Sequence, residues 1–218
     1  MSLNNDIYIL SQKKFDGAKN LPVIQIKFLK PLKMKKVSEY DALVFSSKNG
    51  VEALENIDKS WKTIPSYSIG SGTSGVLKNL GANLVYSANS SYGDDFAREI
   101  TQMLKGKRVL FCRAKVVTSS LNQILLDAGV LLDELIIYET VCGNCDDLVA
   151  PPLNSTIIFS SPSTIKCFFK CFNWSESYRA IVIGTKTASY MPKNIVYDMS
   201  DEQNINSCVK LAKQDVLK

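Results

Sequence analysis

The stretch Leu43–Val51 (LVFSSKNGV) recurs in the chain as Ile157–Ile165 (IIFSSPSTI), 114 residues later. The same offset of 114 residues aligns Ser68–Leu77 (SIGSGTSGVL) with Val182–Met191 (VIGTKTASYM), and no gap is needed between the two matches. Each copy predicts a buried strand, a Ser-Ser turn and a helix, followed by a short strand, a glycine turn and a second helix. The sequence therefore predicts an α/β protein that contains one unit twice.

Two further apolar stretches extend these copies. Residues 6–10 (DIYIL) and 107–112 (KRVLFC) are similar, and polar and basic residues follow each of them. By this analogy the first stretch completes the C-terminal lobe, although it precedes the other lobe in the chain. We therefore expect two similar parallel-sheet α/β lobes. The expected domains are a discontinuous domain 1 (residues 1–23 and 143–218) and an inserted domain 2 (residues 24–142).

The chain is expected to cross between the lobes twice as extended segments, near residues 22–28 and 136–142. Pro31 and the Pro151-Pro152 pair flank these crossings and break helical continuation. The two crossings would form a two-stranded linker. A connection of this kind permits the width of a cleft between the lobes to change.

One helix distinguishes the two expected lobes. Residues 119–128 have apolar side chains at helical spacing, and Gly129 follows as a stop signal. No comparable helix is predicted for residues 11–20, which follow the first strand. The lobe of the first strand therefore lacks a helix that the other lobe keeps.

Composition and charge exclude several classes of protein. Apolar residues make up 45% of the 218 residues, no apolar run is long enough for a membrane span, and the start MSLNNDIYIL lacks the features of a signal peptide. A cytoplasmic protein without a membrane partner is expected. The formal net charge of +5 is spread along the chain, so it favours anionic ligands without indicating nucleic acid.

The chain contains no histidine. This absence excludes Ser-His and Cys-His nucleophiles, histidine metal ligands and an imidazole base. Catalysis would have to use other groups or the positioning of a substrate.

Four cysteines have spacings that metal and redox sites also use. Cys142 and Cys145 form a CxxC pair, and Cys167 and Cys171 form a CxxxC pair, so a four-thiolate zinc site and a redox pair are alternatives. The second pair falls in a predicted helix with an apolar core stripe, which favours reduced thiols and no metal site. The remaining two, Cys112 and Cys208, are expected to be small core residues.

Six motifs, in their order along the chain, resemble the uroporphyrinogen-III synthase family. They are FSSKNGVEAL, SIGSGTSGVL, GKRVLFCRAK, LIIYET, IIFSSPSTI and IGTKTA, and they cover most of residues 43–191. The resemblance implies two α/β lobes joined by a two-stranded linker. It also implies cyclisation of hydroxymethylbilane, a linear tetrapyrrole with eight carboxylates, to uroporphyrinogen III through a spirocyclic intermediate, without a cofactor. The start departs from the family, because YILSQKKF replaces the Thr-Arg that often follows the first strand.

The same resemblance and the strand-to-helix turns nominate site residues. Tyr138 in LIIYET matches a cleft tyrosine of the family, and its phenol would assist the departure of the substrate hydroxyl. Serines, threonines and glycines at the turns would bind carboxylates through hydroxyls and helix N-termini, although each of them also suits a helix cap or a tight turn. Basic residues would add charge-assisted contacts. The expected substrate-binding residues are Ser46, Ser47, Gly70, Thr73, Arg113, Lys115, Ser160, Ser161, Gly184, Lys186 and Thr187.

Two other kinds of protein share these features. A non-enzymatic two-lobed binding protein for an anionic metabolite would have the same duplication, and an inactive paralogue would keep the lobes without the activity. Neither the P-loop motif nor GxGxxG occurs, which disfavours a nucleotide ligand. The resemblance implies that the ligand is hydroxymethylbilane and that the preceding enzyme, hydroxymethylbilane synthase, is a further partner. We expect the protein to be a monomer.

Overall fold

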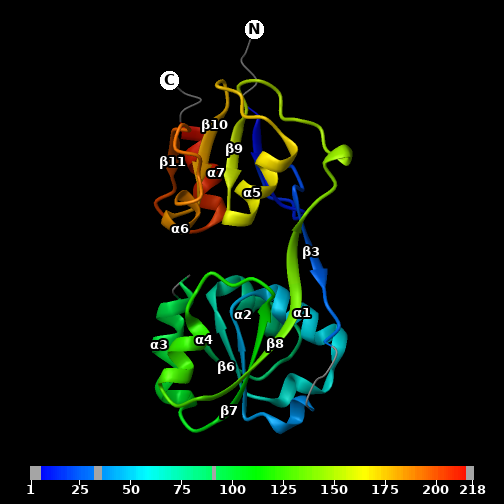
Figure 1. Cartoon of the computed structure of the whole chain (residues 1–218), viewed down its shortest axis with the longest axis vertical. Helices are drawn as coiled ribbons and strands as arrows, with labels where there is room; N and C mark the ends of the chain where they lie inside the picture. The colour runs from blue at the N-terminus through cyan, green and yellow to red at the C-terminus, as the bar shows by residue number, and fades with distance from the viewer. Residues whose placement is uncertain (1–5, 32–35, 90–91, 215–218) are drawn as a thin grey trace. The chain divides into compact units, whose positions relative to one another are not determined.

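The computed structural model describes residues 6–31, 36–89 and 92–214, and the chain divides into two compact units (Figure 1). Unit 1 comprises residues 1–25 and 141–218, and unit 2 comprises residues 26–140. Each unit is built around its own sheet of mostly parallel strands. The chain is therefore a mixed α/β protein, as the repeat predicts.

The sheet of unit 2 has six strands in the order β3-β8-β7-β4-β5-β6. In this order, each of the strands β8, β7, β4, β5 and β6 is parallel to the next. Buried apolar side chains point to both faces of β4, so helices must cover both faces. The strands are β3 (Ile24–Phe28), β4 (Ala42–Phe45), β5 (Ser66–Ile69), β6 (Leu84–Ala88), β7 (Arg108–Ala114) and β8 (Leu131–Cys142).

Two helices cover each face of this sheet. Leu43 and Phe45 pack with α1 and α2 on one face, and Ala42 and Val44 pack with α3 and α4 on the other. The alternation follows from the period of two along a strand. The helices are α1 (Lys48–Ile57), α2 (Gly70–Asn79), α3 (Gly93–Leu104) and α4 (Leu121–Asp127), with 3-10 turns η1 (Val37–Glu39) and η2 (Ser60–Thr63).

The sheet of unit 1 has five parallel strands in the order β11-β10-β9-β1-β2. One face packs on α5 and the other on α7. The strands are β1 (Ile7–Ile9), β2 (Lys19–Asn20), β9 (Thr156–Phe159), β10 (Arg179–Val182) and β11 (Tyr197–Met199). The helices are α5 (Pro162–Cys171), α6 (Thr185–Ala188) and α7 (Ile205–Gln214), with the 3-10 turn η3 (Cys145–Asp147).

In the first half of the repeat, the strand and the helix begin and end at equivalent positions in both copies. The bounds of β9 and α5 are those of β4 and α1 moved by 114 residues. The second half differs, because α2 has ten residues whereas α6 has four. The predicted second helix of the later copy is therefore present, but it has a single turn. Pro192 explains the early stop, since proline disfavours helical backbone at the preceding residue and removes a donor.

The strand at the start of the chain pairs inside unit 1. Tyr8 of β1 aligns with Ile157 of β9, so the first strand belongs to the C-terminal lobe, as the analogy with residues 107–112 predicts. Residues 10–18 form turns without a helix, as expected. In unit 2, α4 follows β7 and ends before Gly129, whose φ of 82° is the left-handed conformation of a helix stop.

The chain passes from one unit to the other within β3 and within β8 (Figure 1). Within unit 1, the Gly143 N–H donates to the Val23 carbonyl at 2.8 Å, and within unit 2 the Leu29 N–H donates to the Ile137 carbonyl at 2.8 Å. The residue numbers of these pairs run in opposite directions, so β3 and β8 are antiparallel neighbours.

The four cysteines of the CxxC and CxxxC pairs form disulfides, Cys142 with Cys167 and Cys145 with Cys171. The prediction of reduced thiols is therefore wrong for the state described here. α5 presents two cysteines on the face that meets the segment after β8, and this proximity is invisible in the sequence. Cys112 and Cys208 are unpaired and buried, as predicted.

No helix in the described part of the chain combines the length and the apolar character that a membrane crossing needs.

Candidate functional site

The carboxyl ends of β4, β5 and β7 meet at one edge of the unit 2 sheet. Phe45, the last residue of β4, aligns with Ser68 of β5 and with Cys112 of β7. Loops that leave this edge of a parallel sheet are the usual ligand-binding elements of open α/β folds. The structure thereby brings together the predicted site residues of unit 2, which are Ser46, Ser47, Gly70, Thr73, Arg113, Lys115 and Tyr138.

A β-bulge places Tyr138 at this edge. Arg113 of β7 aligns with Ile136 of β8, but the next residue, Ala114, aligns with Tyr138, so Ile137 is the extra residue. Ile137 and Tyr138 are consequently both buried, at 0% and 5% exposure, although simple alternation would point one of them outward. The bulge therefore turns the Tyr138 side chain into the core that α1 covers.

Tyr138 and Ser47 form a hydrogen-bonded pair. Burial raises the pKa of Tyr138 above its ordinary value of 10, and a hydrogen bond with the Ser47 side chain acts in the opposite direction. The Ser47 hydroxyl also caps α1, because it accepts a hydrogen bond from the Asn49 N–H at 3.2 Å. Tyr138 is thus a neutral phenol near neutral pH, and a neutral phenol can donate a hydrogen bond.

The N-terminus of α2 is the second feature of this edge. Gly70 begins the helix with a φ of 72°, a conformation that favours glycine, and no side chain caps the helix. A Cβ added at Gly70 or at Gly72 would meet no atom within 4 Å, so the first turn has free space beside it. Thr73 is buried at 6% exposure. The first turn of α2 can therefore present N–H groups to an anion.

The two predicted basic residues of this edge are engaged with carboxylates of β8. The Arg113 guanidinium forms an ion pair with Glu134, and its Nη1 donates to the Ala114 carbonyl at 2.8 Å. The Lys115 Nζ lies 3.2 Å from the Glu139 Oε2, and its side chain is 62% exposed. Arg113 therefore braces the strands beside the bulge, whereas Lys115 lies largely in solvent.

Unit 1 has a comparable edge at the ends of β9 and β10, where Phe159 aligns with Val182. Ser160 and Ser161 follow β9 and are half-buried. Ser161 caps α5 through a capping box, because its hydroxyl accepts from the Thr164 N–H at 3.3 Å while its own N–H donates to the Thr164 Oγ1 at 3.2 Å. The Ser161 hydroxyl is therefore used by the helix.

The turn after β10 carries the remaining predicted residues. Gly184 caps α6, Thr187 is buried at 4% exposure, and Lys186 is exposed. A Cβ at Gly184 would lie 2.5 Å from the Gln203 Nε2, so the Gln203 side chain covers this turn. The sequence offered no signal for Gln203, because its proximity depends on the path of the loop after β11.

Ser68 is a second residue that the sequence analysis missed. It is the last residue but one of β5, its side chain is fully buried, and its hydroxyl has no hydrogen-bond partner among the described residues. Tyr67 and Ile69 pack on the α3 side, so Ser68 faces the α1 side, as Tyr138 does. A buried hydroxyl without a partner is unusual in a folded protein.

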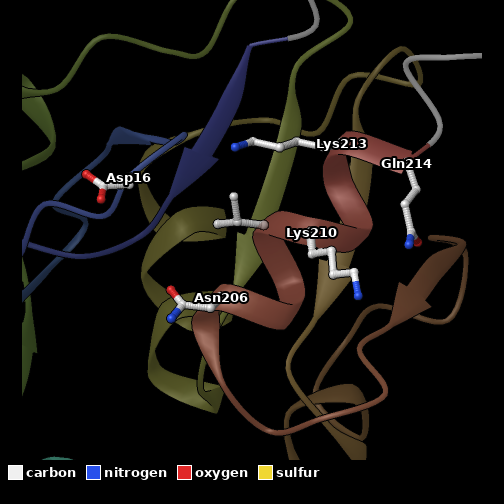
Figure 2. A pocket seen from close by; sticks show the side chains of 6 residues that line it. Asp16, Asn206, Lys210, Lys213 and Gln214 are labelled. Atoms are coloured by element: carbon white, nitrogen blue, oxygen red, sulfur yellow. The ribbon is translucent and has the colours of Figure 1, made fainter.

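Two surface grooves lie away from these edges. One, of about 490 Å³, lies between residue 16 and α7 in unit 1 (Figure 2). Its two lysines, Lys210 and Lys213, point in different directions, so they do not converge on one anion (Figure 2). The other, of about 440 Å³, lies beside Phe28 and Ile57 in unit 2. None of the predicted site residues lines either groove.

The fold and the two sheet edges described above define the structural class of the protein. The chain is a mixed α/β protein in which two parallel sheets each gather hydroxyl-bearing residues and glycines at the carboxyl ends of their strands. The family follows from comparison with known proteins: the model of uroporphyrinogen-III synthase HemD matches residues 18–210. The chain belongs to this family, and the resemblance of its motifs is confirmed.

Solved structures agree with this assignment. Uroporphyrinogen-III synthetase from Helicobacter pylori is similar, with 27% identity and a TM-score of 0.81 over 95% of this chain and 98% of that chain. A mutant uroporphyrinogen III synthase from Thermus thermophilus shares the fold, with 11% identity and a TM-score of 0.58 over 97% of this chain and 98% of that chain. No curated protein matches the chain.

Proposed function

We propose that the chain is a uroporphyrinogen-III synthase, an enzyme that cyclises hydroxymethylbilane and inverts the last pyrrole ring. The observation that carries this proposal is the family match over residues 18–210, which includes every predicted site residue. The hydroxyls and helix N-termini at both sheet edges support it, because a substrate with many carboxylates needs many such donors.

The proposed reaction begins with loss of the terminal hydroxyl. The C–O bond of the hydroxymethyl group breaks, one water leaves, and the electron pair of the pyrrole nitrogen completes an azafulvene. The substituted carbon of the last ring attacks this electrophile and forms a spirocyclic intermediate. Fragmentation and reclosure at the other carbon invert the ring, and a proton is lost as the pyrrole regains aromaticity. The enzyme is thus a hydro-lyase.

Tyr138 is the proposed catalytic residue of the first step. Its neutral phenol donates a hydrogen bond to the departing hydroxyl and so favours its release as water. The hydrogen bond with Ser47 orients the phenol, and the bulge in β8 turns it away from solvent. The other groups of the edge hold the substrate, and positioning of this kind needs no metal or cofactor.

We further propose that the two units act as two lobes joined by the strands β3 and β8. Domain 1 is then residues 1–23 with 143–218, and domain 2 is residues 24–142. Deletion of residues 1–20 tests this organisation, because it removes β1 and β2 from the unit 1 sheet. Amide hydrogen exchange should show lost protection in residues 156–214 and retained protection in unit 2, whereas equal loss in both would refute the division.

The decisive assay supplies hydroxymethylbilane enzymatically and separates the oxidised type I and type III porphyrins. Uncatalysed closure gives type I, so a synthase is recognised by type III product. A binding protein or an inactive paralogue would leave type I as the product. Sedimentation in the same buffer tests the proposed monomer, and its repetition with hydroxymethylbilane synthase tests that enzyme as a partner.

A further inference from the structure

Four cysteines that the proposed reaction does not use lie together in unit 1. Cys142 ends β8, and Cys145 begins η3. Cys167 and Cys171 are four residues apart on α5, so they occupy one face of the helix with Cβ atoms roughly 5–6 Å apart. The Cα atoms are 5.1 Å apart in the Cys142–Cys167 pair and 5.0 Å apart in the Cys145–Cys171 pair. Both disulfides are therefore attached to the same face of α5.

The pairing runs across the two motifs. Each disulfide joins one cysteine of the CxxC segment to one cysteine of the CxxxC helix. A CxxC turn that faces two ligands spaced four apart on a helix is also the arrangement of many structural zinc sites. The fold thus presents four sulfurs from two short segments in a form that suits one tetrahedral ion.

We propose that these four cysteines, once reduced, bind one zinc ion as a structural site with four thiolate ligands. Zn–S bonds of about 2.3 Å place tetrahedral sulfurs about 3.8 Å apart, whereas disulfide sulfurs are about 2 Å apart. In the proposed site, rotation of the cysteine side chains separates the sulfurs by this difference.

Reduction of the two disulfides supplies the four thiols that would bind zinc. A dithiol reductant gives each disulfide two electrons and two protons and leaves as a disulfide itself. The four thiols then release four protons as Zn²⁺ binds their thiolates. In the disulfide state, no group of three or more His, Cys, Asp or Glu side chains in the described ranges is arranged for a metal. Reduction is therefore the step that creates the site.

The structure removes the objection to zinc that the sequence raised. Cys167 belongs to the same buried cluster as Phe168, but its sulfur, like that of Cys171, faces the segment of residues 142–145 to which it is bonded. Reducing compartments also disfavour disulfides, so thiols brought this close need another partner there. A zinc ion bound by these cysteines would fix the end of β8 to α5 and would take no part in the proposed reaction.

The test uses the full chain reduced with dithiothreitol, freed of reductant under nitrogen and dialysed against Zn²⁺. Elemental analysis should find one zinc per chain, and Co²⁺ in its place should give the visible absorption bands of tetrahedral thiolate coordination. Reoxidised protein, with the four thiols lost by thiol titration, should bind neither ion. Zinc should raise the melting temperature of the reduced protein, and the size of the rise should follow the zinc concentration.

Variants separate this site from adventitious binding. Cys171→Ser removes one ligand and should weaken zinc affinity by about a hundredfold or more, at least the loss seen when outer-shell partners are removed. Cys208→Ser, a buried thiol outside the cluster, should bind zinc as the wild type does. Reduced wild-type protein without stoichiometric zinc, an iron–sulfur chromophore on reconstitution, or unchanged affinity in Cys171→Ser would each overturn the proposal.

Discussion

Tyr138→Phe removes the one group that we propose assists loss of the substrate hydroxyl. The phenol is 5% exposed and hydrogen-bonded with Ser47, which keeps a second partner in the Asn49 N–H at 3.2 Å. Since the Ser47 oxygen still accepts from the Asn49 N–H, the loss of stability should be about 0.5–1.5 kcal/mol, the net value of one hydrogen bond.

The expected effect on turnover is much larger. One assisting hydrogen bond or proton transfer contributes roughly ten- to a thousandfold, which corresponds to about 1.4–4 kcal/mol of barrier. Since the phenol acts on the departing group, kcat should fall by this factor with little change in KM. The enzymatic product should remain type III, and type I should rise as spontaneous closure competes.

Tyr40→Phe is the matched control. Tyr40 is also buried in the core beside α1, and its hydroxyl donates to the Asp133 Oδ2 at 2.8 Å. It precedes β4 and therefore lies at the opposite end of the sheet from the strand ends. Porphyrin separation and thermal unfolding are measured on both variants. Wild-type turnover in Tyr138→Phe, or an equal loss in Tyr40→Phe, would refute the role of Tyr138.

Two further predictions concern stability. Gly50→Ala should destabilise the chain by about 1–3 kcal/mol, because the added Cβ would lie 2.8 Å from the Cys112 carbonyl oxygen. A Cβ added at Gly75 would meet no atom within 4 Å. Gly75→Ala should therefore stabilise the chain by up to about 1 kcal/mol. Urea unfolding distinguishes the two, and equal effects would contradict the packing argument. Burial and the hydrogen bond to Asp133 raise the pKa of Tyr40 to about 12, so its stabilising contribution is complete below pH 10 and is lost as the pH rises toward 12. Tyr40→Phe should therefore lose less unfolding free energy than the wild type in that interval, and parallel pH profiles would exclude the effect.

Local patterns were sufficient to predict the first half of each repeat. Each of β4 and β9 has four buried residues, all apolar except Thr156, and Ser47 and Ser161 cap the helices that follow. Strand, cap and helix are all set by neighbours within a few residues, so a sequence reveals them. The duplication also predicts that β1 belongs to the sheet of the C-terminal lobe, because a repeated unit carries information on distant contacts.

Contacts between distant segments could not be read in this way. The bulge that turns Tyr138 inward depends on how β7 and β8 align, and neither strand shows it alone. The position of Gln203 over Gly184 depends on a loop, and the pairing of Cys145 with Cys171 depends on the rotation of α5 about its axis. The glycine turn at the start of α2, in contrast, is predicted by Gly70, whose φ of 72° favours glycine.

The two copies of the repeat differ in the way each holds its first helix. In unit 2, Gly50 lets α1 approach the long strand β7 closely, and a Cβ at this position would clash with that strand. The equivalent position in unit 1 is Thr164, whose side chain completes a capping box instead. Unit 1 also has a three-residue β1, no helix after it, and a single-turn α6. A smaller core gives less stabilisation, and small cores commonly depend on cross-links or metals. The four clustered cysteines all lie in unit 1, where such a cross-link compensates for the packing that the other copy retains.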